Sequence, residues 1–279
     1  MDPDVSAPDA PVGRRSGGPK QAPLPESLPP DRQFATTLAR GLEILRCFTP
    51  DQPLLRNRDI AARMKLSKPT VSRYTYTLTQ LGYLRYEPAS GMYGMGSTVL
   101  ALGYTLLSSL TLRQLSRQAM NQLAEEVNGS VSMAIRDRLN MIYVETSRGS
   151  SARMGLSDVG MSQPIAGTAM GCAYLAGCDA AEREALLNEL RVLAPESWIR
   201  HRDELRAGVA QCDRSGFCVS VNASARISAV GAPLKRRVDR APVAFNCVLP
   251  GSIVKRDYLE KEIGPRLAAM VAGIARKYG

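Results

Sequence analysis

Hydroxyl and basic side chains gather at the start of one predicted helix, within the segment from Ser67 to Tyr86. The side chains that could contact a nucleic acid there are Ser67, Lys68, Thr70, Ser72 and Arg73. Arginine forms bidentate contacts with guanine, and serine or threonine hydroxyls reach bases or phosphates. The alternative is that the hydroxyls cap the helix and the basic residues keep it solvated, which we prefer for any single lysine. For the whole cluster we favour contact with DNA bases.

Basic residues also concentrate around this segment. The formal net charge of the chain is +10, and residues 34–97 hold nine basic side chains against four acidic ones. Arg85 would lie on a strand after the helix, while Arg56 and Arg58 stand at the head of the preceding helix. We expect these three arginines to contact phosphates, which is the salt-sensitive part of DNA binding. A second basic run, at residues 235–240, is better explained as a solvated hairpin turn than as an auxiliary phosphate contact.

Histidine and cysteine are too sparse for most catalytic or metal chemistry. His201 is the single histidine, expected to be exposed, and the six cysteines form no CxxC pair. The ligand spacing of a zinc finger is therefore absent, and we interpret the cysteines as reduced thiols of a cytoplasmic protein. Acid–base chemistry by carboxylates alone stays open. We expect no enzyme activity, no cofactor and no metal.

The elements around the polar cluster predict a winged helix-turn-helix domain. Hydrophobic spacing and turn residues predict three helices and a hairpin, at residues 37–48, 58–66, 67–81 and 83–95. A tight turn joins the second and third helices, which is typical of a motif whose third helix enters the major groove. Ser67 would cap the third helix and Gly82 would end it. We assign residues 34–96 to this DNA-binding domain.

A period of 3.6 residues predicts which side chains these helices bury. In the first helix the apolar stripe consists of Leu38, Leu42, Leu45 and Phe48. In the third helix the buried side consists of Val71, Tyr74, Leu78 and Leu81. Asn57 is the candidate cap of the second helix. These side chains would form a small core and leave the polar cluster free.

Two segments of different composition flank this domain. Residues 1–33 are rich in proline and poor in large apolar groups, so we expect a disordered tail. Residues 97–111 form an apolar helix with Val99, Leu100, Leu102, Leu106, Leu107 and Leu110. That is more apolar surface than a lone linker can leave exposed. The helix would be core of the next domain or the seam of a dimer, and symmetric DNA-binding proteins usually need the latter.

The rest of the chain, residues 112–279, mixes helical and strand patterns. Strands are predicted at residues 130–135, 141–146, 151–156, 217–221, 227–234 and 242–249. Helices are predicted at residues 112–127, 167–177, 179–190, 202–216 and 257–278. Asp179 and Glu182 would form a capping box at the start of one of them. Helices flanking a mostly antiparallel sheet make an α+β domain suited to a sensor.

Four segments, in this order, resemble the IclR-type bacterial transcriptional regulators. They are TLARGLEILRCF, DIAARMKLSKPTVSRYTYTLTQLGYL, SGMYGMGSTVLALGYTLLSS and QPIAGTAMGCAYLAG, within a match from Phe34 to Tyr278. The resemblance implies a winged helix-turn-helix, a linker helix and a GAF-like domain that binds small metabolites. It also implies homodimers or dimers of dimers that bind double-stranded DNA. A two-fold dimer predicts a pseudo-palindromic operator.

The segment from Gln163 to Gly177 is the best candidate for an effector site. Its small residues would let a ligand reach helix-terminal N–H groups, which favour a carboxylate; they would equally let the helix pack close to a sheet. The resemblance places the acid at the amides near Ala169 and Met170. The contacts that it implies are Gly167, Thr168, Ala169, Met170, Ser220, Ile227, Asn246 and Val248. Outside candidates for holding a carboxylate are Arg153, Asn222 and Arg226.

These residues together predict a transcriptional regulator that responds to a small molecule and has no membrane partner. Among the strand positions only Asn246 keeps a clear polar handle, which predicts a hydrophobic or aromatic acid as effector. An enzyme acting on its ligand would instead turn that ligand over. A non-specific architectural DNA protein would bind random and specific DNA alike, and it would not need a large sensor domain.

Overall fold

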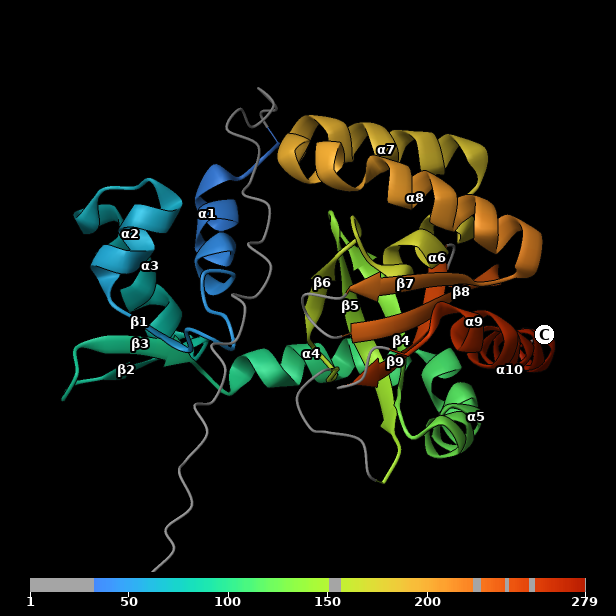
Figure 1. Ribbon diagram of the computed structural model, residues 1–279. Coiled ribbons are helices and arrows are strands. Elements are labelled where there is room, and N and C mark those ends of the chain that lie inside the picture. The colour runs from blue at the N-terminus through green and yellow to red at the C-terminus, as the bar shows by residue number, and fades with distance from the viewer. Residues whose placement is uncertain (1–32, 151–156, 223–226, 239–240, 251–253, 279) are drawn as a thin grey trace, which may run out of the picture.

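The computed structural model of the protein describes residues 33–150, 157–222, 227–238, 241–250 and 254–278 (Figure 1). A small N-terminal domain of helices and short strands is joined by helix α4 (Thr98–Ser109) to a larger domain around a six-stranded sheet. The fold is α+β, as predicted. The expected tail before Gln33 and the expected strand at residues 151–156 lie outside the described residues.

Three helices and a three-stranded sheet form the N-terminal domain. They are α1 (Thr36–Leu45), β1 (Leu54–Leu55), α2 (Asn57–Met64), α3 (Lys68–Gln80), β2 (Leu84–Glu87) and β3 (Met92–Met95). The order of the strands is β1-β3-β2, so the two-residue β1 adds a third strand to the predicted hairpin. A strand of two residues is too short to show the alternation of apolar and polar residues from which strands are predicted. The core consists of Ile44, Leu55, Ile60, Val71, Leu78 and Leu84.

The caps of α3 agree with the sequence. Ser67 is the N-cap, and its Oγ accepts a hydrogen bond from the N–H of Thr70 at 3.4 Å. Gly82 follows the helix with φ of +77°, a left-handed conformation that favours glycine. The next N–H, of Tyr83, donates to the carbonyl of Leu78 at 2.9 Å, which satisfies one of the last carbonyls of the helix. Ser67 and Gly82 therefore fix both ends of this helix.

Three predictions about the small domain are wrong. Leu38 and Leu42 are 62% and 52% exposed, because α1 turns Ile44 toward the core instead. Leu81 is also exposed, since it lies after the last residue of α3. Asn57 is the first residue of α2 and its cap is Arg56; the Oδ1 of Asn57 accepts the hydroxyl of Thr75 at 3.0 Å instead.

The C-terminal domain is built on one antiparallel sheet in the order β6-β5-β4-β9-β8-β7. The strands are β4 (Ser130–Asp137), β5 (Asn140–Arg148), β6 (Ser162–Pro164), β7 (Cys218–Asn222), β8 (Ile227–Val238) and β9 (Ala241–Pro250). Helices α5 (Thr111–Val127) and α10 (Gly264–Lys277) pack on one face. On the other face lies α6 (Ala169–Gly177), which α7 (Ala180–Leu193) and α8 (Pro195–Ser215) cover from outside.

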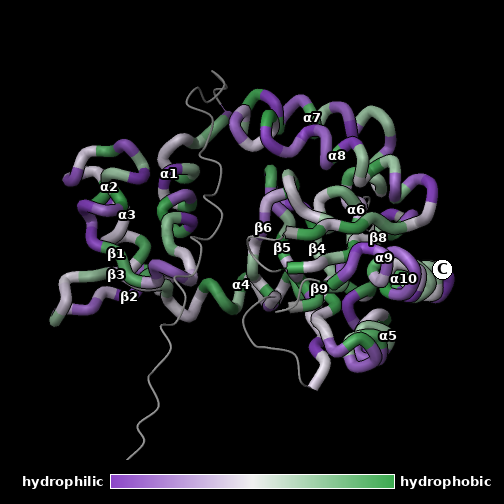
Figure 2. The backbone as a smooth tube through the Cα atoms, viewed as in Figure 1, coloured by the Kyte–Doolittle hydropathy of each residue, from purple (hydrophilic) through white to green (hydrophobic). Residues whose placement is uncertain are grey.

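Alternation along the strands divides the buried side chains between the two faces. On β9, Phe245 and Cys247 enter the core under α5 and α10, while Ala244 enters the core under α6. Asn246 has the same parity as Ala244, so it also lies on the α6 face. Figure 2 shows mainly hydrophobic central strands beside long hydrophilic stretches on α7 and α8.

The terminal helix is interrupted. In place of the single helix predicted at 257–278, there is a short helix α9 (Arg256–Tyr258), a π-helical turn (Leu259–Ile263) and α10. Pro265 lacks a backbone N–H, and its ring would collide with the carbonyl four residues earlier, so the preceding turn widens. Helix α8 begins at Pro195, seven residues earlier than predicted.

Helix α4 meets α5 at a single residue, Leu110. Leu110 is buried in the sensor core, whereas α4 itself contains no buried residue. The exposed side chains of α4 include Leu100, Leu102, Tyr104 and Leu106. The predicted alternative that this helix is core of the next domain therefore holds only near the junction, where Leu107 is partly buried against the sensor core; it is wrong for the exposed side chains before Leu107.

The six cysteines are all free and buried. Burial raises the pKa of Cys47 and Cys178 to about 11 and that of Cys247 to about 12, so these thiols stay protonated at neutral pH. Within the described part of the chain, no group of three His, Cys, Asp or Glu side chains could hold a metal ion. No helix among those residues is long and apolar enough to span a membrane.

Candidate DNA-binding face and effector site

The solvent face of α3 carries the polar cluster. Lys68, Ser72 and Arg73 are exposed, and the hydroxyls of Ser67 and Thr70 lie 2.8 Å apart at the head of the helix. The structure therefore brings together all five predicted residues of this helix. Because they stand in the first two turns, they can enter a groove without moving the buried side of α3.

Sequence reasoning missed two further side chains on this face. Tyr76 and Thr77 are exposed and line a shallow hollow with Ser72 and Arg73. Their positions three and four residues after Arg73 place them on the same side of the helix, which is the signal that could have found them.

Contacts with α2 fix the direction in which α3 faces. Val71 and Leu78 are buried in the small core, and the hydroxyl of Thr75 bridges from α3 to Asn57 of α2. Arg63 of α2 donates to the backbone carbonyl of Cys47, just after α1. These contacts hold the three helices in one arrangement.

The three arginines predicted to contact phosphates are all exposed. Arg85 lies on β2 directly opposite Gly94 of β3. A Cβ on Gly94 would come within 3.3 Å of the Arg85 Nε and Cζ atoms, so the guanidinium lies across the glycine. Arg56 precedes α2, and Arg58 of α2 makes an exposed contact of 3.5 Å with Asp59. Such a contact leaves the cation available.

The predicted effector segment runs from the end of β6 through the whole of α6. Thr168 is the N-cap, and its Oγ1 accepts the N–H of Gly171 at 3.0 Å and donates to the Pro164 carbonyl at 2.8 Å. The first amides of a helix have no partner inside it, so those of Ala169 and Met170 are the donors that this cap does not use. They can hold an anion in front of the helix.

His201 lies against this start of α6, contrary to the expectation that it is exposed. Gly167 has φ of +77°, and a Cβ there would come 2.8 Å from the His201 ring. The His201 Nδ1 lies 3.0 Å from Glu204 Oε2, which orients the ring. The close approach of the ring requires a glycine at position 167.

The start of α6 rests on the sheet at Gly231 of β8. A Cβ on Gly231 would come 2.1 Å from the Ala169 carbonyl oxygen. Gly231 pairs with Asn246 of β9, which pairs with Ser132 of β4, which in turn pairs with Thr146 of β5. Asn246 is therefore a direct neighbour of the strand position under the helix.

The other predicted strand residues lie on the same face, farther along. Gly177 at the end of α6 lies near Pro233 and Pro242, so the helix runs along β8 away from Ile227. Its first amides consequently point toward one rung of the sheet, meaning one row of residues that are paired from strand to strand. That rung consists of Ser220, Ala229, Val248, Ser130 and Arg148. Ile227 lies two residues before Ala229 on β8, on the same face of the sheet. Four of the eight predicted effector residues thus lie at the start of α6, and the other four lie on the strand positions of the α6 face in front of it.

This face is more polar than the sequence suggested. The Nδ2 of Asn246 donates to the Tyr143 hydroxyl at 3.2 Å, and the hydroxyls of Ser132 and Thr146 lie 3.0 Å apart. Burial raises the pKa of Tyr143, and hydrogen bonding with Asn246 and Ser157 partly opposes that rise. The prediction compared only four strand positions, and Ser132, Thr146 and Tyr143 add polar groups that it did not consider. Serines that alternate with Val131 and Met133 along β4 were the available signal.

Two of the outside candidates for a carboxylate partner, Arg153 and Arg226, lie outside the described residues, as does the side chain of Asn222.

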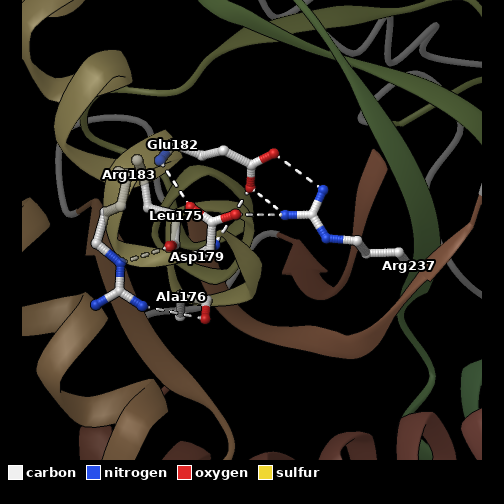
Figure 3. A network of polar contacts seen from close by, with 6 residues as sticks. All are labelled: Leu175, Ala176, Asp179, Glu182, Arg183 and Arg237. Carbon is white, nitrogen blue, oxygen red and sulfur yellow. Dashed lines mark hydrogen bonds and ion pairs between the residues drawn. The ribbon is translucent and has the colours of Figure 1, made fainter. Parts of the chain in front are cut away.

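A network of ion pairs holds the far end of α6 (Figure 3). Asp179 and Glu182 form the predicted capping box of α7, and the guanidinium of Arg237 donates to both carboxylates. The hydrogen bond from Arg237 holds the pKa of Glu182 below its usual value. Arg183 donates to the last carbonyls of α6. Arg237 therefore belongs to strand β8 and to this network while staying exposed, and the pairing of Val238 with Ala241 agrees with the predicted hairpin. Residues 239 and 240 lie outside the described part.

A second set of charges joins the two domains. Glu43 of α1 and Arg46, which caps the end of α1, meet Asp137 at the end of β4 and Arg138 in the turn that follows it. Arg138 has φ of +54°, which is uncommon outside glycine, and it donates to both Glu43 oxygens, one of them at 3.2 Å. The hydrogen bond to Glu43 raises the pKa of Arg138 above its usual value. We call these four residues the interdomain ion-pair cluster.

Two sequence models of known families match the chain. The model described as bacterial transcriptional regulator IclR C-terminal matches residues 104–276, and the IclR helix-turn-helix domain matches residues 37–88. Over 241 residues the chain is 32% identical to the HTH-type transcriptional regulator TsaQ1/TsaQ2 of Comamonas testosteroni, covering 85% of this chain and 86% of that protein.

Solved structures share the fold. An IclR family transcriptional regulator from Brucella abortus is 40% identical with a TM-score of 0.80, over 88% of this chain and 94% of that one. An IclR homologue from Microbacterium hydrocarbonoxydans, complexed with 4-hydroxybenzoate, is 20% identical with a TM-score of 0.62, over 86% of this chain and 98% of that one.

Proposed function

Because this chain belongs to the IclR family of bacterial transcriptional regulators, whose members matched above are regulators and not enzymes, we propose a specific mode of action for it. It binds a pseudo-palindromic operator through α3 and the wing, which is the hairpin formed by β2 and β3. A small carboxylate held at the start of α6 changes its operator affinity. The observation that carries the proposal is the placement of α6, whose first amides point along a buried polar face of the sheet. We also infer that it acts in the cytoplasm, where bacterial DNA lies.

The proposed division of labour among the DNA contacts follows from exposure and position. Ser67, Lys68, Thr70, Ser72 and Arg73 meet base edges, and Arg56, Arg58 and Arg85 hold phosphates. The corresponding domain boundaries are residues 34–96 for DNA binding, 97–111 for the linker helix and 112–279 for effector binding, with residues 1–33 as a tail.

Arg73→Ala is expected to weaken operator binding by about 1–3 kcal/mol and to relax preference at one base position, because a bidentate guanine contact is lost. The measurement is a mobility-shift titration on an operator selected from random double-stranded DNA, and on its single-base variants. Arg85→Ala is the matched comparison: it should weaken all sequences alike and lower the slope of affinity against salt. Unchanged operator affinity of Arg73→Ala would contradict the docking.

We propose that the exposed apolar side chains of α1 and α4 meet a second copy of the chain. Helix α4 carries no charged residue between Thr98 and Ser109, so a copy related by a two-fold axis needs no complementary charge. Leu38 and Leu42 of α1 add to this apolar surface. A dimer presents two α3 helices to two half-sites, which accounts for a pseudo-palindromic operator.

The proposed effector is a small carboxylic acid. The amides of Ala169 and Met170 receive its carboxylate, Gly167 and Thr168 shape the loop in front, and Ser220, Ile227, Asn246 and Val248 form the wall on the sheet. The 4-hydroxybenzoate complex of the Microbacterium hydrocarbonoxydans homologue supports an acid of this size in this fold. A thermal-shift screen of carboxylic acids, followed by mobility shifts with each acid that binds, tests the proposal; it fails if no carboxylate changes operator affinity.

The interdomain ion-pair cluster is the proposed route by which the effector affects DNA binding. Glu43→Gln removes the carboxylate partner of Arg138 while keeping its size, so the change in operator affinity caused by the effector should shrink several-fold. The ratio of operator affinities with and without acid measures this change. Glu126→Gln, at an exposed site on α5, is the control and should leave the ratio unchanged. A full response in Glu43→Gln would remove the cluster from the mechanism.

A further inference from the structure

Among the buried polar atoms that have no hydrogen-bond partner within the described residues, three lie at neighbouring positions on the α6 face of the sheet. They are Asn246 Oδ1, Ser130 Oγ and Arg148 Nε. Asn246 is 2% exposed and Ser130 is 1% exposed. More than nine in ten buried polar groups in folded proteins have a partner, so three such atoms on adjacent rungs of one sheet indicate a place where another molecule binds.

The register places these atoms in front of α6. Asn246 pairs with Ser132, and Ser130 pairs with Val248 one same-face step along, so Asn246 and Ser130 are diagonal neighbours across β4 and β9. Diagonal neighbours lie about 7–8 Å apart, close enough for a single bound group to contact both side chains. The first amides of α6 point toward this same rung.

The chemistry of the two side chains selects the bound group. The Nδ2 of Asn246 is already used on Tyr143, so its free oxygen can only accept a hydrogen bond. The Ser130 hydroxyl can donate one. A group that donates to the first and accepts from the second is a hydroxyl. Arg148 Nε, on the same rung as Ser130, adds a further donor to an oxygen-bearing ligand.

We propose that the effector is a hydroxy-carboxylic acid, whose carboxylate lies on the α6 amides and whose hydroxyl bridges Asn246 Oδ1 and Ser130 Oγ. This rests on the proposed effector function and makes it narrower. An acid without the hydroxyl would leave both side chains buried and unpaired, which is how a polar site rejects an analogue that lacks one polar group. Asn246 and Ser130 are then the residues that set specificity.

The test uses matched pairs of acids on the full chain: 4-hydroxybenzoate with benzoate, 4-hydroxyphenylacetate with phenylacetate, and lactate with propionate. Calorimetric titration measures both members of each pair, and mobility shifts record release from or binding to the operator. In the wild type at least one hydroxy acid should bind ten-fold or more tightly than its partner.

Two variants locate the hydroxyl contact. Asn246→Leu removes the unpaired oxygen, and Ser130→Ala removes the hydroxyl with a smaller change in volume. In each, the preference for the hydroxy acid should fall toward one, mainly through weaker binding of the hydroxy acid. Ser228→Ala is the control, because this buried serine lies on the opposite face of the sheet and accepts the N–H of Val254. It should keep the preference.

The outcomes separate the two proposals. Equal affinity for both members of every pair, or a preference that survives in both variants, overturns the hydroxyl contact and leaves the proposed effector function standing. If no acid of either kind binds, both proposals fail. Should Asn246→Leu unfold, as circular dichroism would record, Ser130→Ala decides the question alone.

Discussion

Leu102→Glu is expected to convert the protein to a monomer and to lower its operator affinity more than 100-fold. Leu102 is 58% exposed on α4, a helix with no buried residue and no charge. In the proposed dimer its side chain would lose contact with water, and a carboxylate there would be buried without a partner, which costs several kcal/mol. A monomer binds each half-site separately and loses the advantage of linked binding.

Analytical ultracentrifugation and mobility shifts on the full operator measure this result. Leu102→Met preserves an apolar side chain, and Ser108→Glu places a charge at an exposed site on the same helix. Both controls are expected to stay closer to the wild type than Leu102→Glu. A dimeric Leu102→Glu protein with wild-type affinity for the operator would show that the dimer interface does not include this face of α4.

Gly231→Ala is expected to abolish the response to effector and to lower the free energy of unfolding by about 1–3 kcal/mol, which is typical of overpacking. The new Cβ would stand 2.1 Å from the carbonyl oxygen of Ala169, and backbone atoms cannot turn aside as a flexible side chain can. The start of α6 would have to lift from the sheet, and its amides would move with it. The DNA-binding domain should remain folded.

Gly177→Ala provides the matched control, because Gly177 lies at the other end of the same contact between α6 and the sheet. There a Cβ would meet Pro233 and Pro242 at 3.6 Å, an ordinary packing distance, so stability and response should be nearly unchanged. Denaturant titration gives the free energies, and operator affinity with and without acid gives the response. A responsive Gly231→Ala protein would place effector recognition away from the start of α6.

Some ends of elements were predictable, although the cap assigned to Asn57 and the start of α8 were not. Ser67, Gly82 and the capping box of Asp179 and Glu182 act through their own backbone neighbours, so their residue types alone determine their roles. The buried side of α1 was not predictable in the same way. Its apolar residues outnumber those that the small core needs, and a period of 3.6 residues does not distinguish a core from an interface with another chain.

The effector face shows a different limit. Family resemblance directed attention to Asn246 and Val248 on β9, but Ser130, Tyr143 and Arg148 reach the same face from β4 and β5. Which strands become neighbours depends on sheet order, and β4 pairs with β9 across more than a hundred residues of chain. Alternation along a single strand gives the side of each residue, not the identity of its neighbours across the sheet.

The junction at Leu110 has a mechanical consequence. Leu110 joins α4 to α5 with a non-helical backbone (φ −78°, ψ 86°), so we expect a small change at this residue to alter the angle between the two helices. Twelve residues of helix extend about 18 Å, so a tilt of about 10° carries the far end about 3 Å. That displacement is about one base-pair step of DNA. In the proposed dimer, such a tilt would shift the two α3 helices relative to the two half-sites of the operator.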